Sequence, residues 1–328
     1  MKALLLEQFG TPFQVKEVPT PAAGPGQVLV KIAASAVNPL DLKIMAGEAP
    51  HAKVSPPTIL GIDMAGTVEA IGEGVFSVKA GDEVYGMTGG VGGIQGSLAE
   101  YAAVDADLVA KKPNNLSLRE SAALPLVFIT AWEGLVDRAE VGQGKKVLIH
   151  GGAGGVGHIA IQLAVAKGAQ VFSTVDLSRF ELVERYGAIP IDYNKLSVDE
   201  YVKQYTSGEG FDIVFDTVGG TTLDASFQAA RQYYGHVVSI LGWGTHRLAP
   251  LSFKGASYSG VFTLYPLISG MGRAHHAYIL REAASLAESG RLVPLVDRVI
   301  YTPGTIEKAY RRIKDRNNQG KIVVDIRF

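Results

Sequence analysis

Three glycines with the spacing Gly-x-Gly-x-x-Gly, at positions 152, 154 and 157, follow the apolar segment 147–150. The first glycine of such a motif permits a tight turn, the second lets a pyrophosphate approach the backbone, and the third allows close helix–strand packing. The run 159–167 predicts a helix, whose N-terminus offers unpaired N–H groups and a partial positive charge. We therefore predict that a dinucleotide is bound by Gly152, Ala153, Gly154, Gly155, Val156 and Gly157. A glycine-rich turn that serves only packing is the alternative.

The elements around this turn predict a parallel sheet. Residues 170–175 form a second short apolar strand, and Ser178 with Glu181 matches a capping box that begins a helix. Further strands are expected at 211–216 and 236–241, each followed by small residues. Ligands of doubly wound sheets bind beyond the carboxyl ends of the strands. We therefore predict cofactor contacts from Val218, Leu241 and Gly242.

Composition narrows the class of protein. The 328 residues are 47% hydrophobic, which suffices for two domains. With 31 basic and 32 acidic residues the formal net charge is −1, so we expect a small-molecule substrate and neither a nucleic-acid nor a membrane partner. The chain has no cysteine, which excludes disulfides, thiolate metal sites and a cysteine nucleophile. The N-terminal apolar run ends at Glu7, too early for a signal peptide, and we expect a cytoplasmic protein.

The first third of the chain has a different pattern of residues. Short segments rich in β-branched residues, at 27–33, 66–71, 82–85 and 98–102, alternate with turns and predict a small barrel-like β domain. A capping box at 117–120 then begins the helical part. In the tail we expect a helix at 274–288, a strand at 296–301, a helix at 305–314 and a strand at 321–325. We assign residues 1–121 and 267–328 to one domain and residues 122–266 to the cofactor domain.

Taken together, the motifs resemble the medium-chain dehydrogenase/reductase superfamily, in particular its zinc-free quinone oxidoreductase branch. They stand at 33–41, 61–68, 80–86, 124–134 and 151–157. The resemblance implies an α/β fold, with a Rossmann doubly wound parallel sheet and a GroES-like β-barrel catalytic domain. It also implies a homodimer and the reduction of quinones or α,β-unsaturated carbonyls by a nicotinamide cofactor. A conjugated acceptor takes hydride at carbon and spreads the charge to oxygen, so hydrogen-bond donors suffice.

The resemblance also bears on metal binding. Where zinc-bearing relatives have a cysteine and a Gly-His-Glu element, this chain has Asn38 and residues 61–63, Gly-Ile-Asp. An amide and an alkyl group replace a thiolate and an imidazole, so we expect no metal site. His51 is near in sequence, but a single histidine without partners is more often a surface residue.

For catalysis the resemblance implies Asn38 and Thr130 beside the nicotinamide. Asn38 before a proline also suits a turn, and Thr130 could instead bond its own helix. Asp41 is expected to be structural. Lys43 stands where many relatives have a tyrosine; it could donate to a developing oxyanion, although an exposed lysine is the commoner outcome.

Cofactor choice depends on the end of the second strand. Asp176 could bond the ribose hydroxyls of NADH, whereas Arg179 could pair with the 2′-phosphate of NADPH. The strand pattern places Val175 at the usual acidic position, and the resemblance puts Tyr193 beside the adenosine phosphate. We favour NADPH and keep NADH open.

The resemblance adds two further positions. Lys321, in a Gly-Lys element, could reach the cofactor or only begin the last strand. Phe262, in the stretch 261–265, would belong to the nicotinamide wall and the subunit contact, although by composition alone this stretch is another buried strand. An enoyl-thioester reductase and a non-catalytic NADPH-binding protein remain alternative functions; no basic cluster suited to coenzyme A is visible.

Overall fold

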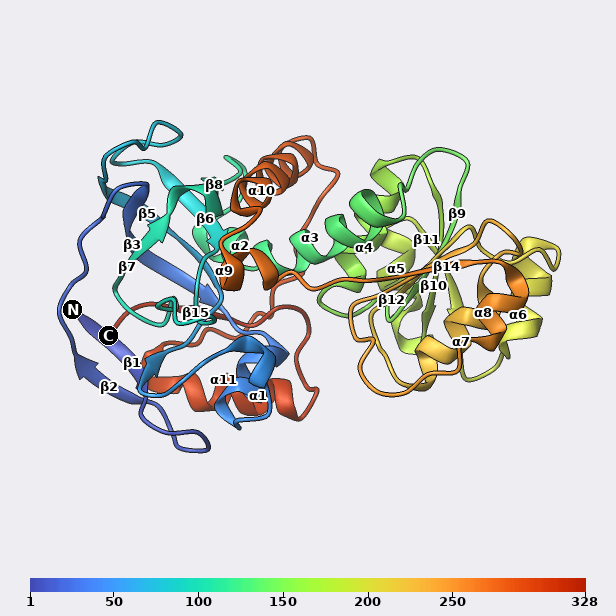
Figure 1. Ribbon diagram of the computed structural model, residues 1–328, viewed down its shortest axis with the longest axis horizontal. Helices are drawn as coiled ribbons and strands as arrows, with labels where there is room; N and C mark the ends of the chain where they lie inside the picture. Colours follow the sequence, from blue (N-terminus) through green and yellow to red (C-terminus); the bar gives the residue numbers. More distant parts are fainter. The chain divides into compact units, whose positions relative to one another are not determined.

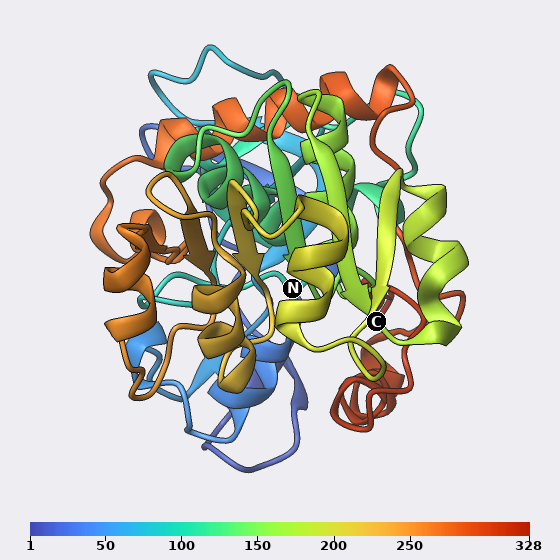
Figure 2. The same ribbon diagram turned by 90° about the vertical axis from the view of Figure 1, so that its right-hand side faces the viewer.

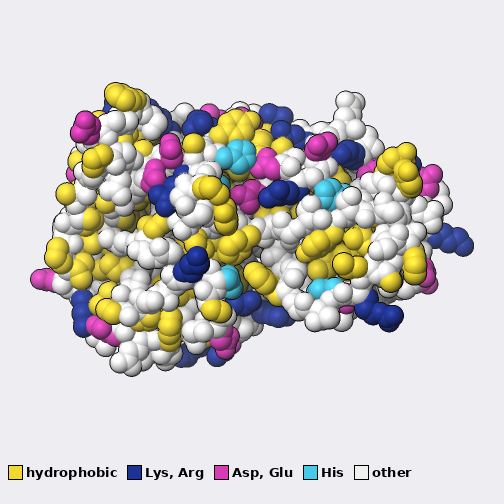
Figure 3. Space-filling view, viewed as in Figure 1, with side chains coloured by type: hydrophobic (Ala, Val, Ile, Leu, Met, Phe, Trp, Pro, Cys, Tyr) yellow, Lys and Arg dark blue, Asp and Glu magenta, His cyan; other side chains and the backbone are white.

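The computed structural model describes residues 1–328, which divide into two compact units. Unit 1 comprises Met1–Leu126 and Leu264–Phe328, and unit 2 comprises Val127–Thr263 (Figure 1). No helix in the chain is long and apolar enough to cross a membrane. On the face in Figure 3, Lys and Arg side chains are interspersed with Asp and Glu rather than gathered by sign.

Unit 2 is built on one six-stranded sheet whose strands all run parallel (Figure 2). The strands, in the order in which they lie, are β11 (Ala188–Asp192), β10 (Gln170–Val175), β9 (Lys146–His150), β12 (Ile213–Asp216), β13 (His236–Ser239) and β14 (Ser257–Gly260). The strand order reverses between β9 and β12, which is the switch point of a doubly wound sheet. This arrangement confirms the predicted Rossmann sheet.

Helices connect the strands of unit 2. They are α3 (Pro125–Trp132, which begins in unit 1), the π-helix η3 (Glu133–Arg138), α4 (Gly157–Ala166), the 3₁₀ turn η4 (Leu177–Arg179), α5 (Phe180–Arg185), α6 (Val198–Thr206), α7 (Thr221–Ala229) and α8 (Ala249–Lys254). On one face of the sheet, Leu148, Phe172, Val214 and Val237 pack with side chains of α6, α7 and α8 in a buried cluster. This apolar layer supports the strand ends that follow it.

Unit 1 is built on antiparallel strands. Its larger sheet runs β15 (Val323–Asp325), β3 (Gln27–Ala36), β5 (Asp63–Ile71), β6 (Glu83–Met87) and β8 (Val109–Lys111), with β7 (Tyr101–Asp105) paired to β3. A smaller sheet joins β2 (Gln14–Glu17), β1 (Lys2–Leu6) and β4 (Thr58–Ile59). The helices are α1 (Pro39–Met45), η1 (Pro50–Ala52), η2 (Ala106–Leu108), α2 (Leu118–Ala122), α9 (Tyr265–Ser269), α10 (Arg273–Glu288), η5 (Pro303–Thr305) and α11 (Ile306–Lys314).

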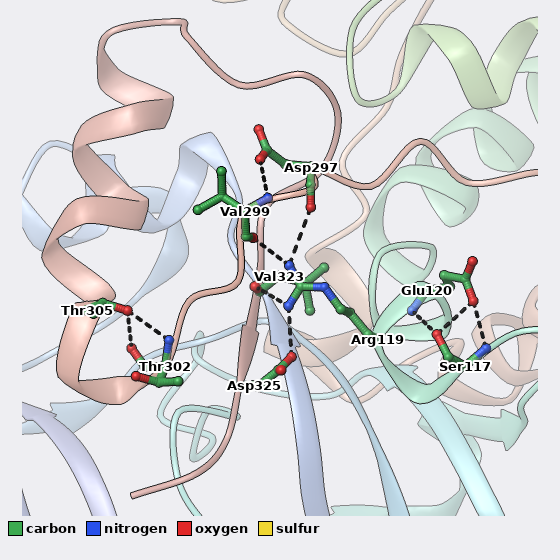
Figure 4. Close-up of polar contacts among 9 residues, drawn as sticks. All are labelled: Ser117, Arg119, Glu120, Asp297, Val299, Thr302, Thr305, Val323 and Asp325. Carbon is green, nitrogen blue, oxygen red and sulfur yellow. Dashed lines mark hydrogen bonds and ion pairs between the residues drawn. The ribbon is translucent and has the colours of Figure 1, made fainter.

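Within unit 1, Arg119 on α2 binds residues of the C-terminal tail (Figure 4). Its Nη1 donates to the Val323 carbonyl at 2.9 Å and to Asp325 Oδ1 at 2.8 Å, and its Nη2 donates to the Val299 carbonyl at 2.8 Å. Ser117 and Glu120 form the predicted capping box at the start of this helix. One capped helix therefore fixes the tail that carries Lys321.

Three local expectations were wrong, and two of them, at 296–301 and 178–181, were overturned by hydrogen bonds to aspartates. Residues 296–301 form only isolated bridges, because the Asp297 carboxylate accepts from the Val299 N–H at 2.9 Å and bends the chain. Ser178 does not begin a helix as the first residue of a capping box. Asp176 instead caps η4, accepting from the Ser178 N–H at 3.0 Å.

The stretch 261–265 is not a buried strand. β14 ends at Gly260, and α9 begins at Tyr265. Phe262 is 37% exposed and Tyr265 49%.

Candidate functional site

The glycine turn after β9 is tight, as predicted, but its left-handed residue is Gly151, which precedes the motif, and not Gly152. Gly151 has φ +75°, and the Gly154 N–H donates to its carbonyl at 2.9 Å. A Cβ on Gly152 would lie 2.0 Å from Ser173 Oγ, and one on Gly157 would lie 2.2 Å from the Gly151 oxygen. A Cβ on Gly154 would meet only that same oxygen, at 3.2 Å. Gly152 and Gly157 therefore permit packing, whereas Gly154 leaves an exposed stretch of backbone.

The turn also offers backbone donors. The N–H groups of Ala153, Gly155 and Val156 donate to no other backbone group, and α4 begins directly after them. His158 stabilises the turn, because its N–H donates to the Gly154 carbonyl at 3.1 Å and its Nδ1 lies 2.9 Å from the same oxygen. Free N–H groups at a helix N-terminus suit an anion, so the residues present fit a dinucleotide pyrophosphate.

At the end of β10, the side chains that bear on cofactor choice are differently placed. Val175 is buried. The Asp176 Oδ1 accepts from both the N–H and the hydroxyl of Ser178, so part of this carboxylate is used in capping. Arg179 is half-buried, and Tyr193, just after the neighbouring strand β11, is 57% exposed.

Asp216 holds the turns after β12 and β13, although no sequence motif pointed to it. Its Oδ1 accepts from the N–H groups of Val218 at 3.0 Å and Gly219 at 2.9 Å, and its Oδ2 accepts from Ser239 Oγ at 2.7 Å. Ser239 Oγ in turn accepts from the Leu241 N–H at 3.1 Å. An acidic residue at the end of an otherwise apolar strand was the signal that could have identified it.

Asp216 belongs to a polar row across the sheet. Thr174, His150, Asp216 and Ser239 occupy one register position on four neighbouring strands, and all are buried. Each stands two residues beyond a member of the apolar cluster, on the same face. His150 Nδ1 lies 2.8 Å from Thr174 Oγ1, and His150 Nε2 has no partner. Burial lowers the pKa of His150 to about 4, although Asp216 acts in the opposite direction.

In unit 1 the fold brings together two of the predicted residues, Asn38 and Lys321. Asn38 Nδ2 donates to Asp63 Oδ2 at 3.0 Å, and Lys321 Nζ donates to Asn38 Oδ1 and lies 3.6 Å from Asp63 Oδ2. The other oxygen of Asp63 accepts from the Leu126 N–H at 2.8 Å. Asn38 is 1% exposed and Lys321 6%. These three side chains, with Asp41, are called the unit 1 cluster below.

Burial governs the charges of this cluster. It raises the pKa of Asp63 and lowers that of Lys321, while their mutual attraction acts against both shifts. Burial also raises the pKa of Asp41 to about 7, despite the hydrogen bond that its Oδ2 accepts from the Asn38 N–H at 2.7 Å. The Oδ1 of Asp41 has no partner. Asp41 therefore bonds backbone, as predicted for a structural residue.

Of the remaining predicted residues, Lys43 lies in unit 1 and the others lie in unit 2. Lys43 is exposed in the last turn of α1. Thr130 belongs to unit 2, where it lies on α3 and is 5% exposed. Val218 is 50% exposed, Gly242 is exposed and Leu241 is half-buried. The roles of these residues stay predictions.

Comparison with known proteins identifies the family to which this fold belongs. The alcohol dehydrogenase GroES-like domain family matches residues 24–114, and the zinc-binding dehydrogenase family matches residues 187–324. The NADPH-dependent alkenal/one oxidoreductase of Arabidopsis thaliana chloroplasts is 33% identical over 99% of this chain and 79% of its own length. The chain belongs to the medium-chain dehydrogenase/reductase superfamily. The 2-methylene-furan-3-one reductase of Solanum lycopersicum is 42% identical over 67% of this chain, a match that spans 57% of that protein.

Solved structures of this superfamily share the fold along the whole chain. An alcohol dehydrogenase superfamily protein from Novosphingobium aromaticivorans is 53% identical with a TM-score of 0.97, and the match covers 100% of both chains. A quinone oxidoreductase from Coxiella burnetii is 29% identical with a TM-score of 0.83, covering 100% of this chain and 99% of that one. The relatives are oxidoreductases, which supports an enzyme that uses a nicotinamide cofactor.

The superfamily includes zinc enzymes. We therefore ask whether the side chains of the unit 1 cluster could bind zinc. Positions 38 and 63 of the cluster hold an amide and a carboxylate that already share the ammonium group of Lys321. No group of at least three His, Cys, Asp or Glu side chains is arranged to hold a metal ion. A catalytic zinc needs three protein ligands, so this donor set does not fit it.

Proposed function

We propose that this protein is a zinc-independent, NADPH-dependent reductase that transfers hydride to a quinone or an α,β-unsaturated carbonyl. The observation that carries the proposal is the glycine turn after β9, where the N–H groups of Ala153, Gly155 and Val156 are free to receive a pyrophosphate. The turn stands at the carboxyl edge of the sheet, beside the switch point.

The proposed class of hydride acceptor follows from the side chains that are present at the usual zinc positions. Oxidising an alcohol requires removal of both a proton and a hydride, which a Lewis acid assists. The side chains at 38 and 63 do not fit zinc, and a conjugated acceptor needs only hydrogen-bond donors for its developing oxyanion. Relatives named for alkenal/one, furanone and quinone substrates support this class.

The choice of NADPH rests on the end of β10. Asp176 caps η4 through one carboxylate oxygen, which leaves it less suited to hold two ribose hydroxyls. Arg179 follows in the same turn and could pair with a 2′-phosphate, and the exposed ring of Tyr193 could pack beside it. A preference for NADH would assign the ribose to Asp176 instead.

When bound, the nicotinamide supplies the hydride. In this proposal Asn38 and Thr130 orient the reacting groups, and the proton comes through water. Lys43 is the alternative donor to the oxyanion. Asn38 acts from a fixed position, because its amide is held by Asp63 and Lys321.

We also propose that two copies associate through β14. This strand has a neighbour on one side only, β13, and three of its four residues are exposed. An exposed edge of this kind can pair with a second chain. Light scattering of the purified protein would give twice the mass of one chain; the mass of a single chain would contradict this proposal.

The function is tested by following NADPH absorbance after adding a quinone or an enone, beside NADH and with a chelator present. Chelator-resistant turnover that prefers NADPH is the expected result. Loss of turnover with chelator would contradict zinc independence. NADPH binding without turnover of either acceptor would favour a non-catalytic binding protein, unless an enoyl thioester is reduced.

A further inference from the structure

Asp216 is a buried acid whose partners are two backbone N–H groups and one serine hydroxyl at the carboxyl edge of the unit 2 sheet. It is 0% exposed, and no lysine or arginine pairs with it. A buried carboxylate is costly unless hydrogen bonds satisfy it. Here the donors are Val218, Gly219 and Ser239, so its position depends on the turns after β12 and β13.

The Asp216 carboxylate links two turns, and the neighbouring residue Thr217 links a third. The carboxylate binds the turn at 218–219 directly and reaches Leu241 through Ser239. Thr217, the next residue in the chain, donates from Oγ1 to the His150 carbonyl at 2.6 Å, which joins the turn after β9. The turns also pack closely, since a Cβ on Gly219 would lie 2.7 Å from the Leu241 oxygen.

The order of the strands indicates which half of the cofactor lies near which turn. A dinucleotide lies across the switch point, here between β9 and β12, with its adenosine half toward the strand that carries the ribose-binding residue. That strand is β10, on one side of β9. The nicotinamide half then falls on the side of β12 and β13, where Val218 and Gly242 are exposed.

We propose that Asp216 is a positioning residue that holds the turns after β12 and β13 in the form that receives the nicotinamide half of the cofactor. It does not touch the reacting atoms. The proposal rests on the proposed function, because it requires a dinucleotide at this edge. Its partner Ser239 transmits the same restraint to Leu241.

The test compares two ligands, NADPH and 2′-phospho-ADP-ribose, which lacks the nicotinamide. In Asp216→Ala we expect the affinity for NADPH to fall about tenfold, while the affinity for the fragment changes less than about twofold. Isothermal titration measures both. Faster amide hydrogen exchange at 217–220 and 241–242 should accompany the loss.

Asp216→Asn is the second variant, and it keeps the protein testable if the alanine variant does not fold. An amide retains one oxygen for the N–H groups of Val218 and Gly219, so we expect a smaller loss, about threefold, still confined to NADPH. The matched control is Asp212→Asn. Asp212 precedes the same strand at its other end and also accepts a backbone N–H, that of Lys146 at 2.8 Å. It should leave both affinities unchanged.

An equal loss for both ligands in the Asp216 variants, or no loss, would overturn the positioning role. Wild-type protein that binds the fragment and NADPH but reduces no acceptor would contradict the proposed function alone. Wild-type protein that binds neither ligand would overturn both.

Discussion

The unit 1 cluster and the polar row of unit 2 bury acids in different ways. In unit 1, Asp63 faces the ammonium of Lys321, so a charge is balanced by an opposite charge. In unit 2, Asp216 is satisfied by two backbone N–H groups and a serine hydroxyl. The first arrangement depends on a counter-ion that is far away in the sequence, and the second depends on the shape of neighbouring turns. We therefore expect unit 1 to be sensitive to single charge changes and unit 2 to changes in the turns.

The largest effect is expected from Lys321→Met. The change leaves Asp63 buried without its counter-ion, so the free energy of unfolding should fall by about 3–5 kcal/mol. Urea denaturation measures this. Lys43→Met, at an exposed lysine of the same unit, is the control and should cost less than about 0.5 kcal/mol. Equal losses in the two variants would show that the ion pair does not stabilise unit 1.

A double variant sharpens the same point. Asp63→Asn removes the buried negative charge but keeps an oxygen for the Leu126 N–H. Combined with Lys321→Met, it should recover about 2 kcal/mol of the loss, because an uncharged site no longer needs a counter-ion. Additive losses in the same urea experiment would contradict this coupling.

The third prediction concerns pH. The pKa of Asp41 is about 7 in the folded protein against 3.8 ordinarily, so the folded state holds more protons between these values. The stability from this group is full at low pH and lost as the pH rises through 7. Between pH 6 and 8 the loss should be about 1.4 kcal/mol. In Asp41→Asn, the free energy of unfolding should change by about 1.4 kcal/mol less between pH 6 and 8 than in the wild type, as measured by urea unfolding at both pH values. An unchanged pH dependence would show that other groups cause it.

The smallest effect is expected in unit 2. Ser239→Ala removes one donor to Asp216, but the N–H groups of Val218 and Gly219 remain. The cost should be about 1 kcal/mol. Thermal melting measures this, and the control is Ser252→Ala, at an exposed serine of α8. A loss as large as that of Lys321→Met would show that the two regions bury their acids alike.

Much of the framework could be predicted because its signals are local. The glycine spacing at 152–157 defines its own turn, and the capping box at 117–120 forms as expected. Strands such as β10 match their apolar segments. The segments at 178–181 and 296–301 differ because Asp176 and Asp297 bond nearby backbone, a competition that hydrophobic pattern does not reveal.

The sequence by itself determined the dinucleotide turn and the alternation of strands and helices, since these depend on neighbouring residues. Only the tertiary structure decided that Asn38 and Lys321 meet, because 283 positions separate them and sheet pairing brings β15 beside β3. The tertiary structure also decided that Asp216 and Ser239 lie side by side, because the register between parallel strands cannot be predicted from the sequence of either strand alone.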